Sequence, residues 1–417
     1  MPLTDDDRAA LLDRFLRYVR VDTQSDPASD AQPSTAKQLD LIAMLADECA
    51  AIGLSEIGRS DLGPMWATLP GDADAPAILL CSHVDTSPEN PGRDVQPQVV
   101  DRYDGGPIPL PGDASQTIRP EEHPDLAACL GHTLITSDGT TLLGADDKAG
   151  LAVIMTAVDI LQRDGLPHPP IEVLFTVDEE IGRGLTGVDL GSFDAVCGYT
   201  LDGDAAGKLN AETFSADGAT VTVRGVNIHP SIGKGRMVNA VKILAEFLAT
   251  LPEDLLAPET SEGMQPFVHP HTVAGGVESA SCEFILRSFD TDELERQAAA
   301  LREHARHVAS RDERCVIEVT TRKQYRNMRD GLSKEPRAVA LARRAVTAAG
   351  LELKEEPIRG GTDGSLMTAA GLPTPNLSTG QHTPHSLQEW ASLDEMASAV
   401  AVLIELAALW AAEPRES

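Results

Sequence analysis

Three runs of the chain are apolar on both faces, which is the pattern of strands buried in a sheet that helices cover. The runs are "PAILLCSHVDT" (76–86), apolar until its serine, "IEVLFTV" (171–177) and "CGYTL" (197–201). Apolar residues recur at helical spacing between and after these runs. The predicted helices cover residues 34–52, 148–163, 335–349 and 393–412. Alternating strands and helices predict an α/β fold, a mixed sheet covered by helices, with ligands beyond the carboxyl ends of its strands.

The order of the elements changes between residues 214 and 325. This segment predicts three strands and two helices, a compact α+β module inserted into the larger domain. The strands contain "ATVTVRG", "SCEFILRSF" and "CVIEVTTRKQY". We therefore expect a larger domain in two parts, 1–213 and 326–417, and a smaller domain at 214–325. A hairpin is also expected around Asp138-Gly139, a dipeptide that favours tight turns.

The length supports two domains, because 417 residues exceed the usual size of one hydrophobic core. No run of 18 apolar residues occurs, and the first residues lack the basic start and apolar centre of a signal peptide. We therefore expect a cytoplasmic protein that does not enter a membrane. The six cysteines are scattered without a C-x-x-C pair, so neither a disulfide framework nor a thiolate zinc site is expected.

Acidic residues outnumber basic ones by 65 to 34, which gives a net charge of −31. Such a charge argues against nonspecific binding to nucleic acid or to anionic membranes. Because the excess is spread along the chain, it favours a strongly hydrated surface, with adaptation to high salt as an alternative. Some of the carboxylates could instead be metal ligands, and composition alone does not separate these uses.

Each of the three apolar runs ends at acidic residues, and the first run also ends at a histidine. His83 and Asp85 end the first run, Glu179 and Glu180 follow the second, and Asp202 follows the third. One charged strand end is usually a solvated turn, but three at one sheet edge indicate a site. His83 and Asp85 are two residues apart, so on a strand they share a face and the carboxylate can fix the tautomer of the imidazole.

Asp146 opens a predicted helix and adds a carboxylate to the same set. Together with His83, Glu180, Asp202 and a further histidine, it would supply imidazole and carboxylate ligands to two zinc ions without any cysteine. Asp146 is the natural candidate to bridge the ions, as a shared carboxylate does in two-metal hydrolases. Glu179, beside a ligand glutamate, is then free to act as the general acid and base.

The segments around these positions resemble the peptidase T family, the tripeptide aminopeptidases of the di-zinc aminopeptidase and carboxypeptidase group. The similarity extends over almost the whole chain. The segments that carry it are "SHVDTSP" (82–88), "TLLGADDKAG" (141–150), "FTVDEEIGRG" (175–184), "YTLDG" (199–203), "NIHPSIGKGRMVNA" (227–240), "IRGGTDGS" (358–365) and "PNLSTG" (375–380). The H-x-D and D-E-E elements are shared with the wider group of amidohydrolases. The second, fifth and sixth segments look specific to peptidase T.

The zinc ligands that the resemblance implies, for two ions per subunit, are His83, Asp146, Glu180 and Asp202. It implies in addition that Asp85 orients His83, that Glu179 is the acid and base, and that a cis peptide follows Asp146. The last ligand is a histidine after the "NLSTG" turn. Counting without gaps gives His385, and His382 could replace it.

In the family, the inserted module is a ferredoxin-like lid and dimerisation domain. The resemblance therefore implies a homodimer, and it makes 1–213 and 326–417 the two parts of the catalytic domain. It also implies that His229 stabilises the oxyanion of the reaction. Without the family, a histidine before Pro230 is more simply explained as a turn cap.

Substrate binding has weaker support in the sequence. Arg287, Arg329 and Arg359 are candidates to clamp a carboxylate, because guanidinium groups bind carboxylates through two hydrogen bonds. Each could equally serve a structural ion pair. Asn239 could contact the scissile carbonyl or cap the helix that follows it.

The combined expectation is a zinc metallo-aminopeptidase that releases the N-terminal residue from short peptides, tripeptides above all. A dipeptidase, carboxypeptidase or N-acyl amino acid deacylase of the same fold is the first alternative, because the ligand set does not distinguish these bonds. A noncatalytic peptide-binding protein is the alternative from another class. The divergent segment "QHTPHSLQEW" (381–390) is its main support.

Overall fold

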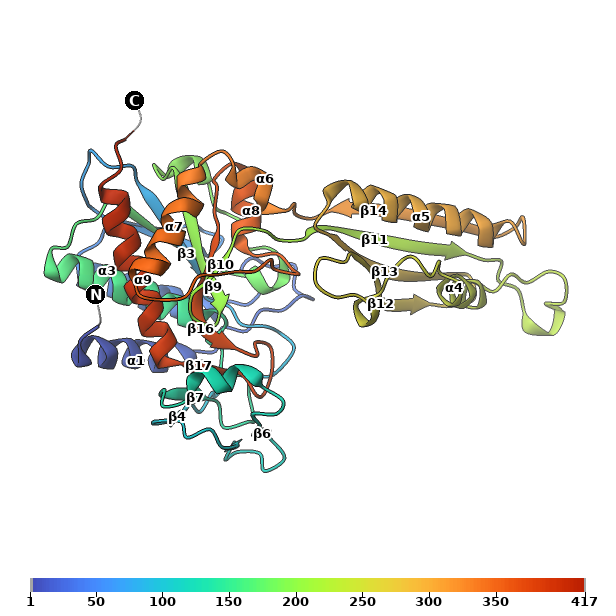
Figure 1. The fold of residues 1–417 in the computed structure, drawn as a ribbon. Coiled ribbons are helices and arrows are strands. Elements are labelled where there is room, and N and C mark those ends of the chain that lie inside the picture. Colours follow the sequence, from blue (N-terminus) through green and yellow to red (C-terminus); the bar gives the residue numbers. More distant parts are fainter. Residues whose placement is uncertain (1–2, 416–417) are drawn as a thin grey trace. The chain divides into compact units, whose positions relative to one another are not determined.

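A mixed sheet is the centre of the first of two units in the computed structural model, which describes residues 3–415 (Figure 1). The strands follow the order β1-β2-β8-β3-β9-β16-β17-β7-β4, with β10 and β15 off this path. Their bounds are β1 Ser55–Arg59, β2 Met65–Leu69, β3 Ile78–His83, β4 Gln98–Val100, β7 Leu134–Thr136, β8 Ile171–Thr176, β9 Cys197–Asp204, β10 Lys208–Asn210, β15 Lys354–Glu355, β16 Asn376–His382 and β17 Trp390–Ser392. The three predicted buried strands are confirmed as β3, β8 and β9. They run parallel, with β16 parallel to β9, so their carboxyl ends meet at one edge.

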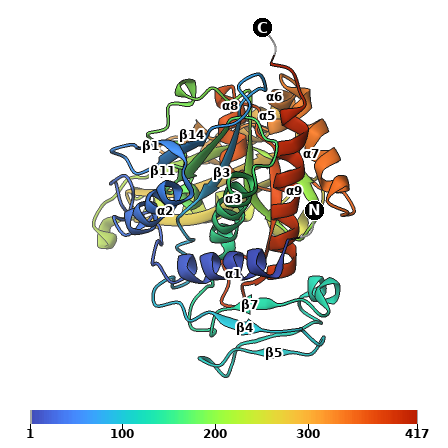
Figure 2. The same ribbon diagram turned by 90° about the vertical axis from the view of Figure 1, so that its left-hand side faces the viewer.

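Helices cover both faces of this sheet (Figure 2). Their bounds are α1 Asp5–Val19, α2 Gln38–Ile52, α3 Ala145–Asp164, α7 Pro336–Ala348, α8 Asp363–Ala370 and α9 Leu393–Ala411. The short helix α6 (Met328–Leu332) contains residues of both units. On one face α3 contacts both α1 and α9, and their apolar side chains form the main core with β3 and β8. On the other face, Met367 of α8 packs on Leu79 and Leu174 of the sheet. Regular helix in α3 starts after Asp147, because Asp146 and Asp147 have nonhelical backbone angles.

Residues 98–136 form a small lobe with little regular structure. It contains β4, β5 (Ile108–Pro109), β6 (Thr117–Ile118), the 3₁₀ helix η1 (Pro124–Cys129) and β7, around a small core that also includes Trp390 of β17. The hairpin expected around Asp138-Gly139 is wrong. Strand β7 pairs with β4 on one side and β17 on the other, which leaves no free edge for a returning strand. Residues 137–141 instead form a turn, in which the Ser137 hydroxyl donates a hydrogen bond to the carbonyl of Thr141.

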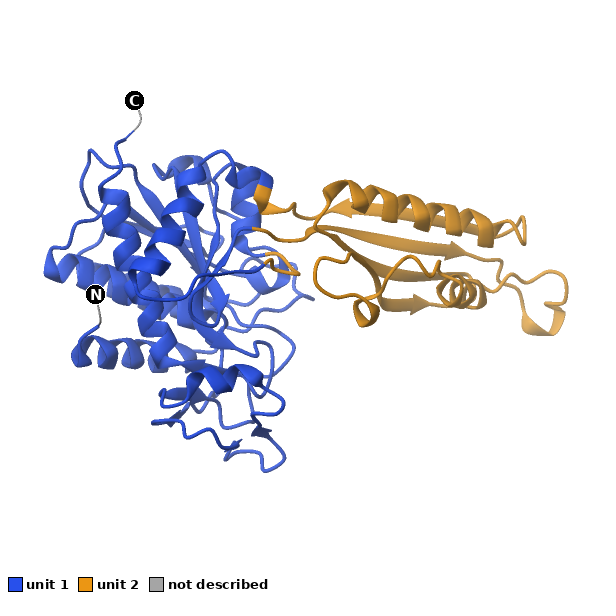
Figure 3. Ribbon diagram, in the orientation of Figure 1, with its two compact units in different colours: residues 1–211, 330–356, 362–417 blue, residues 212–329, 357–361 orange. Residues whose placement is uncertain are grey.

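The second unit comprises Glu212–Arg329 and Pro357–Gly361 (Figure 3). Its elements are β11 Ser215–Arg224, α4 Ala240–Ala249, β12 Phe267–Gly275, β13 Ser279–Ser288, α5 Thr291–Ala309 and β14 Val316–Lys323. The antiparallel sheet has the order β12-β13-β11-β14, and with this β-α-β-β-α-β chain order it is ferredoxin-like, as expected. Residues 357–361, assigned from sequence to the larger domain, join this unit because Ile358 pairs with Thr213.

Between residues 3 and 415, no helix has both the length and the apolarity needed to cross a membrane.

Candidate metal centre

The side chains predicted as ligands meet at the carboxyl edge of the parallel strands, within the first unit. His83 is the last residue of β3, Asp202 lies in β9, and Glu180 lies in the 3₁₀ helix η2 (Glu179–Ile181) that follows β8. Asp146 precedes the regular part of α3, and His385 lies in the loop between β16 and β17. Five segments that are distant in sequence thus supply carboxylate and imidazole donors to one place.

Asp146 lies between two imidazoles. Its Oδ1 is 3.0 Å from Nε2 of His83, and its Oδ2 is 3.4 Å from Nε2 of His385. Burial alone would raise the pKa of Asp146, but the two histidines hold it below its ordinary value. The peptide between Asp146 and Asp147 is cis. With one oxygen on each side, this carboxylate has the arrangement of a ligand shared by two cations.

The other donors lie on the two sides of Asp146. Asp202 Oδ1 is 4.0 Å from Nε2 of His83, and Glu180 Oε2 is 2.9 Å from Nε2 of His385. Donor atoms of His83, Asp147 and Asp202 also lie within 4.8 Å of one another. Asp147 is otherwise engaged, since its Oδ2 accepts hydrogen bonds from the hydroxyl of Ser82 and the backbone N–H of His83.

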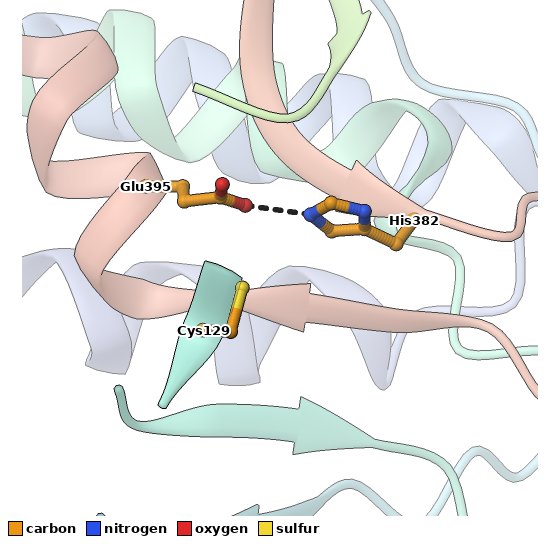
Figure 4. Close-up of side chains that lie close together, drawn as sticks. All are labelled: Cys129, His382 and Glu395. Carbon is orange, nitrogen blue, oxygen red and sulfur yellow. Dashed lines mark hydrogen bonds and ion pairs between the residues drawn. The ribbon is translucent and has the colours of Figure 1, made fainter. Parts of the chain in front are cut away.

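The loop after β16 brings His385, and not His382, to these carboxylates. His385 has a left-handed backbone (φ 61°), and its carbonyl accepts a hydrogen bond of 2.7 Å from the amide of Asn90. His382 points elsewhere: its Nε2 is 2.6 Å from Glu395 Oε2 (Figure 4). Its ring stacks on Trp390 with 3.8 Å between the centroids. Of the two histidines that the sequence left open, the loop places His385 beside Asp146 and Glu180.

Asp85 contacts both His83 and the acidic turn after β8. Its carboxylate accepts hydrogen bonds from the backbone N–H groups of Glu179 (3.0 Å) and Glu180 (3.2 Å). Nδ1 of His83 is 3.0 Å from the carbonyl oxygen of Asp85 and 3.5 Å from its carboxylate. The hydrogen-bond partner of the imidazole is thus the backbone carbonyl of Asp85, whereas the predicted carboxylate lies farther away. Asp85 therefore helps to fix the positions of the His83 imidazole and of the acidic turn.

Asp178 is a buried anchor of the same turn, and sequence reasoning gave it no role. Its backbone is left-handed (φ 61°). Its carboxylate accepts hydrogen bonds of 2.6 Å from the backbone N–H of Ser34 and from the side-chain amide of Gln38, the first residue of α2. The only sequence signal was its place as the first acid of "DEE". The turn that carries Glu179 and Glu180 is thus tied to the start of α2.

Glu389 is a second acid that sequence reasoning missed. Its Oε2 accepts hydrogen bonds of 2.8 Å from the backbone N–H groups of Leu143 and Gly144. Its Oε1 accepts a hydrogen bond of 3.0 Å from the backbone N–H of Asp146. The side chain is buried, and burial raises its pKa to about 7. Glu389 therefore holds the backbone that carries Asp146. Its sequence signal was slight, an acid directly before a buried tryptophan.

Several acidic side chains are buried close together around Asp146. Burial and the charge of Asp146 raise the pKa of Glu180 to about 7, and burial raises the pKa values of Glu179 and Asp202 well above their ordinary range. Oε1 of Glu180 is buried, and no hydrogen-bond partner lies near it in the described structure. A cation would satisfy this atom and offset the charge. The donors are carboxylates and imidazoles, a set that suits zinc.

The remaining predicted site residues belong to the second unit. They are His229, Asn239, Arg287, Arg329 and Arg359. Two of them cap short segments: Nδ1 of the exposed His229 accepts a hydrogen bond from the N–H of Ser231 in η4 (Pro230–Ile232), and Asn239 accepts one from the N–H of Val241 in α4. The cap roles left open in the sequence are therefore present.

The three arginines also have partners within the second unit. Nη1 of Arg287 donates to Gln324 at 3.1 Å, and its guanidinium lies over the ring of Tyr325. Arg329 forms an ion pair of 2.8 Å with Glu212, and Arg359 donates to the hydroxyl of Ser261 at 2.8 Å.

The chain is similar to known proteins in its sequence and in its fold. Residues 136–409 match the family model described as peptidase family M20/M25/M40. The chain is 43% identical over 403 residues to peptidase T of Geobacillus thermodenitrificans, covering 96% of this chain and 98% of that protein. It is 41% identical to peptidase T of Bacillus subtilis, covering 95% and 97%. Among solved structures, an aminopeptidase PepT from Bacillus cereus (24% identity, TM-score 0.76) and a tripeptidase from Staphylococcus aureus (23%, 0.78) share its fold, each covering 97% of this chain and 99% of that chain.

Proposed function

We propose that this chain, which belongs to the peptidase family M20/M25/M40 and within it to the peptidase T group, releases the N-terminal residue of tripeptides with the help of two zinc ions. Membership of this family makes the chain a metallopeptidase, which hydrolyses peptide bonds. The observation that carries the proposal is the carboxylate of Asp146, which faces His83 with one oxygen and His385 with the other.

The proposed metal ligands form two sets that share Asp146. His83 and Asp202 would hold one ion, and Glu180 and His385 would hold the other. The unpaired buried oxygen of Glu180 and the excess of buried carboxylates support cations at both positions. When bound, two zinc ions acidify a water molecule and polarise the carbonyl of the substrate.

Glu179 acts as the acid and base of the reaction. It takes a proton from the attacking water and delivers it to the leaving amine. Burial raises the pKa of Glu179, which suits a group that must hold the proton between the two steps. Asp85 aims Glu179 by binding its backbone N–H. His229, exposed on the inserted unit, donates a hydrogen bond to the oxyanion.

Replacing Glu179 by Gln tests this assignment, because the amide keeps the shape of the side chain but cannot take a proton. We expect the variant to retain about two zinc ions per chain and to lose at least about 10²-fold in turnover of Ala-Ala-Ala. Elemental analysis measures the metal, and released alanine measures the turnover. Wild-type turnover in the Glu179→Gln variant would contradict the role of this residue.

Blocked peptides test which bond is cut. An aminopeptidase must recognise the free amine, so we expect cleavage of Ala-Ala-Ala, none of its N-acetyl form, and a raised KM for its C-terminal amide. The raised KM of the amide would reflect the loss of carboxylate binding by Arg287, Arg329 or Arg359. Asn239 is proposed separately to contact the scissile carbonyl. Cleavage of the N-acetyl peptide would favour a carboxypeptidase or a deacylase instead.

We propose in addition a cytoplasmic homodimer that forms through the inserted unit. Strands β12 and β14 are the two edges of its sheet, and they carry the exposed apolar residues Val273 and Val316. Unpaired edge strands with apolar side chains favour self-association. The six cysteines are free and buried, which fits a reducing compartment. A monomer in sedimentation of the full chain would contradict the dimer.

A further inference from the structure

A second group of metal-binding side chains lies in the first unit, apart from the donors around Asp146. Cys129 ends η1, His382 ends β16, and Glu395 lies in the first turn of α9 (Figure 4). One donor atom of each lies within 4.8 Å of the other two. We propose that these three side chains bind a third metal ion, a structural zinc. This inference does not depend on the proposed peptidase activity.

The three side chains are withdrawn from water. Cys129 is 0%, His382 2% and Glu395 7% exposed. Thiols, imidazoles and carboxylates that are buried together are costly unless they are paired or bind a metal. Burial also raises the pKa of the Cys129 thiol to about 12. A metal ion overcomes the raised pKa of the thiol, because it binds the thiolate form. Binding releases two protons to solvent, one from the thiol and one that His382 and Glu395 share.

The imidazole of His382 is oriented as a metal ligand would be. Stacking on Trp390, with 3° between the ring planes, fixes the ring, and its Nε2 points at Glu395. The other ring nitrogen, Nδ1, is buried with no hydrogen-bond partner in the described structure, and it faces Oδ2 of Asp125 at 3.6 Å. Zinc-bound histidines generally place a carboxylate or carbonyl at the second nitrogen. His83 and Asp85 have the same relation in the first metal centre.

The donor set agrees with zinc and with a structural role. Zinc accepts sulfur, nitrogen and oxygen donors in a tetrahedron, so three side chains and one water would complete the site. Such an ion would join the small lobe at 98–136 to β16 and α9. It would also anchor the start of the loop that carries His385. Sequence spacing gave no sign of the cluster, because its members lie on distant segments.

Cobalt(II) tests the proposal on the full wild-type chain, after its metals have been removed with a chelator and replaced. A cobalt–thiolate bond gives a near-ultraviolet charge-transfer band, and the donors around Asp146 contain no sulfur. We therefore expect the band in the wild-type chain. It should disappear in Cys129→Ser and persist in Cys49→Ser, a matched control at another buried cysteine. Zinc content should fall by about one ion per chain in Cys129→Ser and should not fall in Cys49→Ser.

Absence of the band in the wild-type chain would overturn the proposal and leave His382 and Glu395 as an ion pair only. The same band in Cys129→Ser would also overturn it. Because the first outcome is measured without any substitution, a folding defect in a variant cannot decide the result.

Discussion

Acids outside the proposed ligand set hold the proposed metal ligands in position. Glu389 accepts hydrogen bonds from three backbone N–H groups, and the last of them belongs to Asp146. The direction of the Asp146 carboxylate therefore depends on the acceptor oxygens of a residue from another part of the chain. Partners of this kind typically contribute about 10- to 100-fold to metal affinity or activity.

Replacing Glu389 by Gln should lower kcat/KM for Ala-Ala-Ala by about 10- to 100-fold, with weaker metal binding. An amide has one acceptor oxygen where the carboxylate has two, so at least one N–H loses its partner. Steady-state kinetics and zinc titration measure both effects. Glu172→Gln is the matched control, because Glu172 is also buried and accepts from the backbone N–H groups of Asp194 and Ala195, at the other end of β8. Equal losses in the two variants would contradict a specific effect on Asp146.

The residues that end strands were predicted from the sequence, as was the supporting residue Asp85, but Asp178 and Glu389 were not. His83, Glu180 and Asp202 follow or end apolar runs, so their convergence follows from the parallel sheet. Asp178 and Glu389 bind backbone N–H groups of distant segments. Any residue can supply such an N–H, so these contacts leave no pattern in the sequence.

At the scale of elements, the acidic turn after β8 is held from two sides. Asp85, just beyond β3, binds its backbone N–H groups, and Asp178 ties it to α2. Its left-handed backbone at Asp178 would be unfavourable for most residues, but Asp and Asn tolerate it. The position of the turn thus relies on hydrogen bonds to the carboxylates of Asp85 and Asp178.

Asp178→Asn should keep this backbone and weaken the hydrogen bonds to Ser34 and Gln38. We expect a loss of about 1–3 kcal/mol in the free energy of unfolding, because hydrogen bonds to a charged group are replaced by neutral ones. Urea unfolding measures this loss. Asp94→Asn is the matched control, since Asp94 has the same left-handed φ of 61° but is exposed. A similar loss at Asp94 would show that the backbone, and not the carboxylate, is responsible.

Elements buried on both faces were the predictable ones. Every residue of β3 and β8 is buried, so their apolar runs are nearly continuous, with Glu172 as the interruption in β8. Strand β12 was missed because "FVHPHTVAG" is mostly exposed and interrupted by Pro270. The short strands of the lobe at 98–136 were also not resolved from sequence, since two or three residues carry no periodicity.

At the scale of the whole molecule, the two units have separate cores. The main core contains residues of the first unit, and the core under α4 and α5 contains residues of the second. All the proposed metal ligands belong to the first unit. A ligand that binds only the folded state stabilises the part that it binds, by about 2.7 kcal/mol at a free concentration 100-fold above its Kd.

Removing the metals should therefore destabilise the first unit and leave the second largely unchanged. The buried carboxylates around Asp146 repel one another when no cation offsets them, so β3, β8 and the start of α3 should open more often. Hydrogen exchange followed by mass spectrometry, on the full chain with and without chelator, measures this by segment. We expect faster exchange around residues 78–85 and 171–180, and unchanged exchange at 215–224 and 279–288. Restoring zinc should reverse the change, and equal loss of protection in both units would show that the metals stabilise the molecule as one cooperative body.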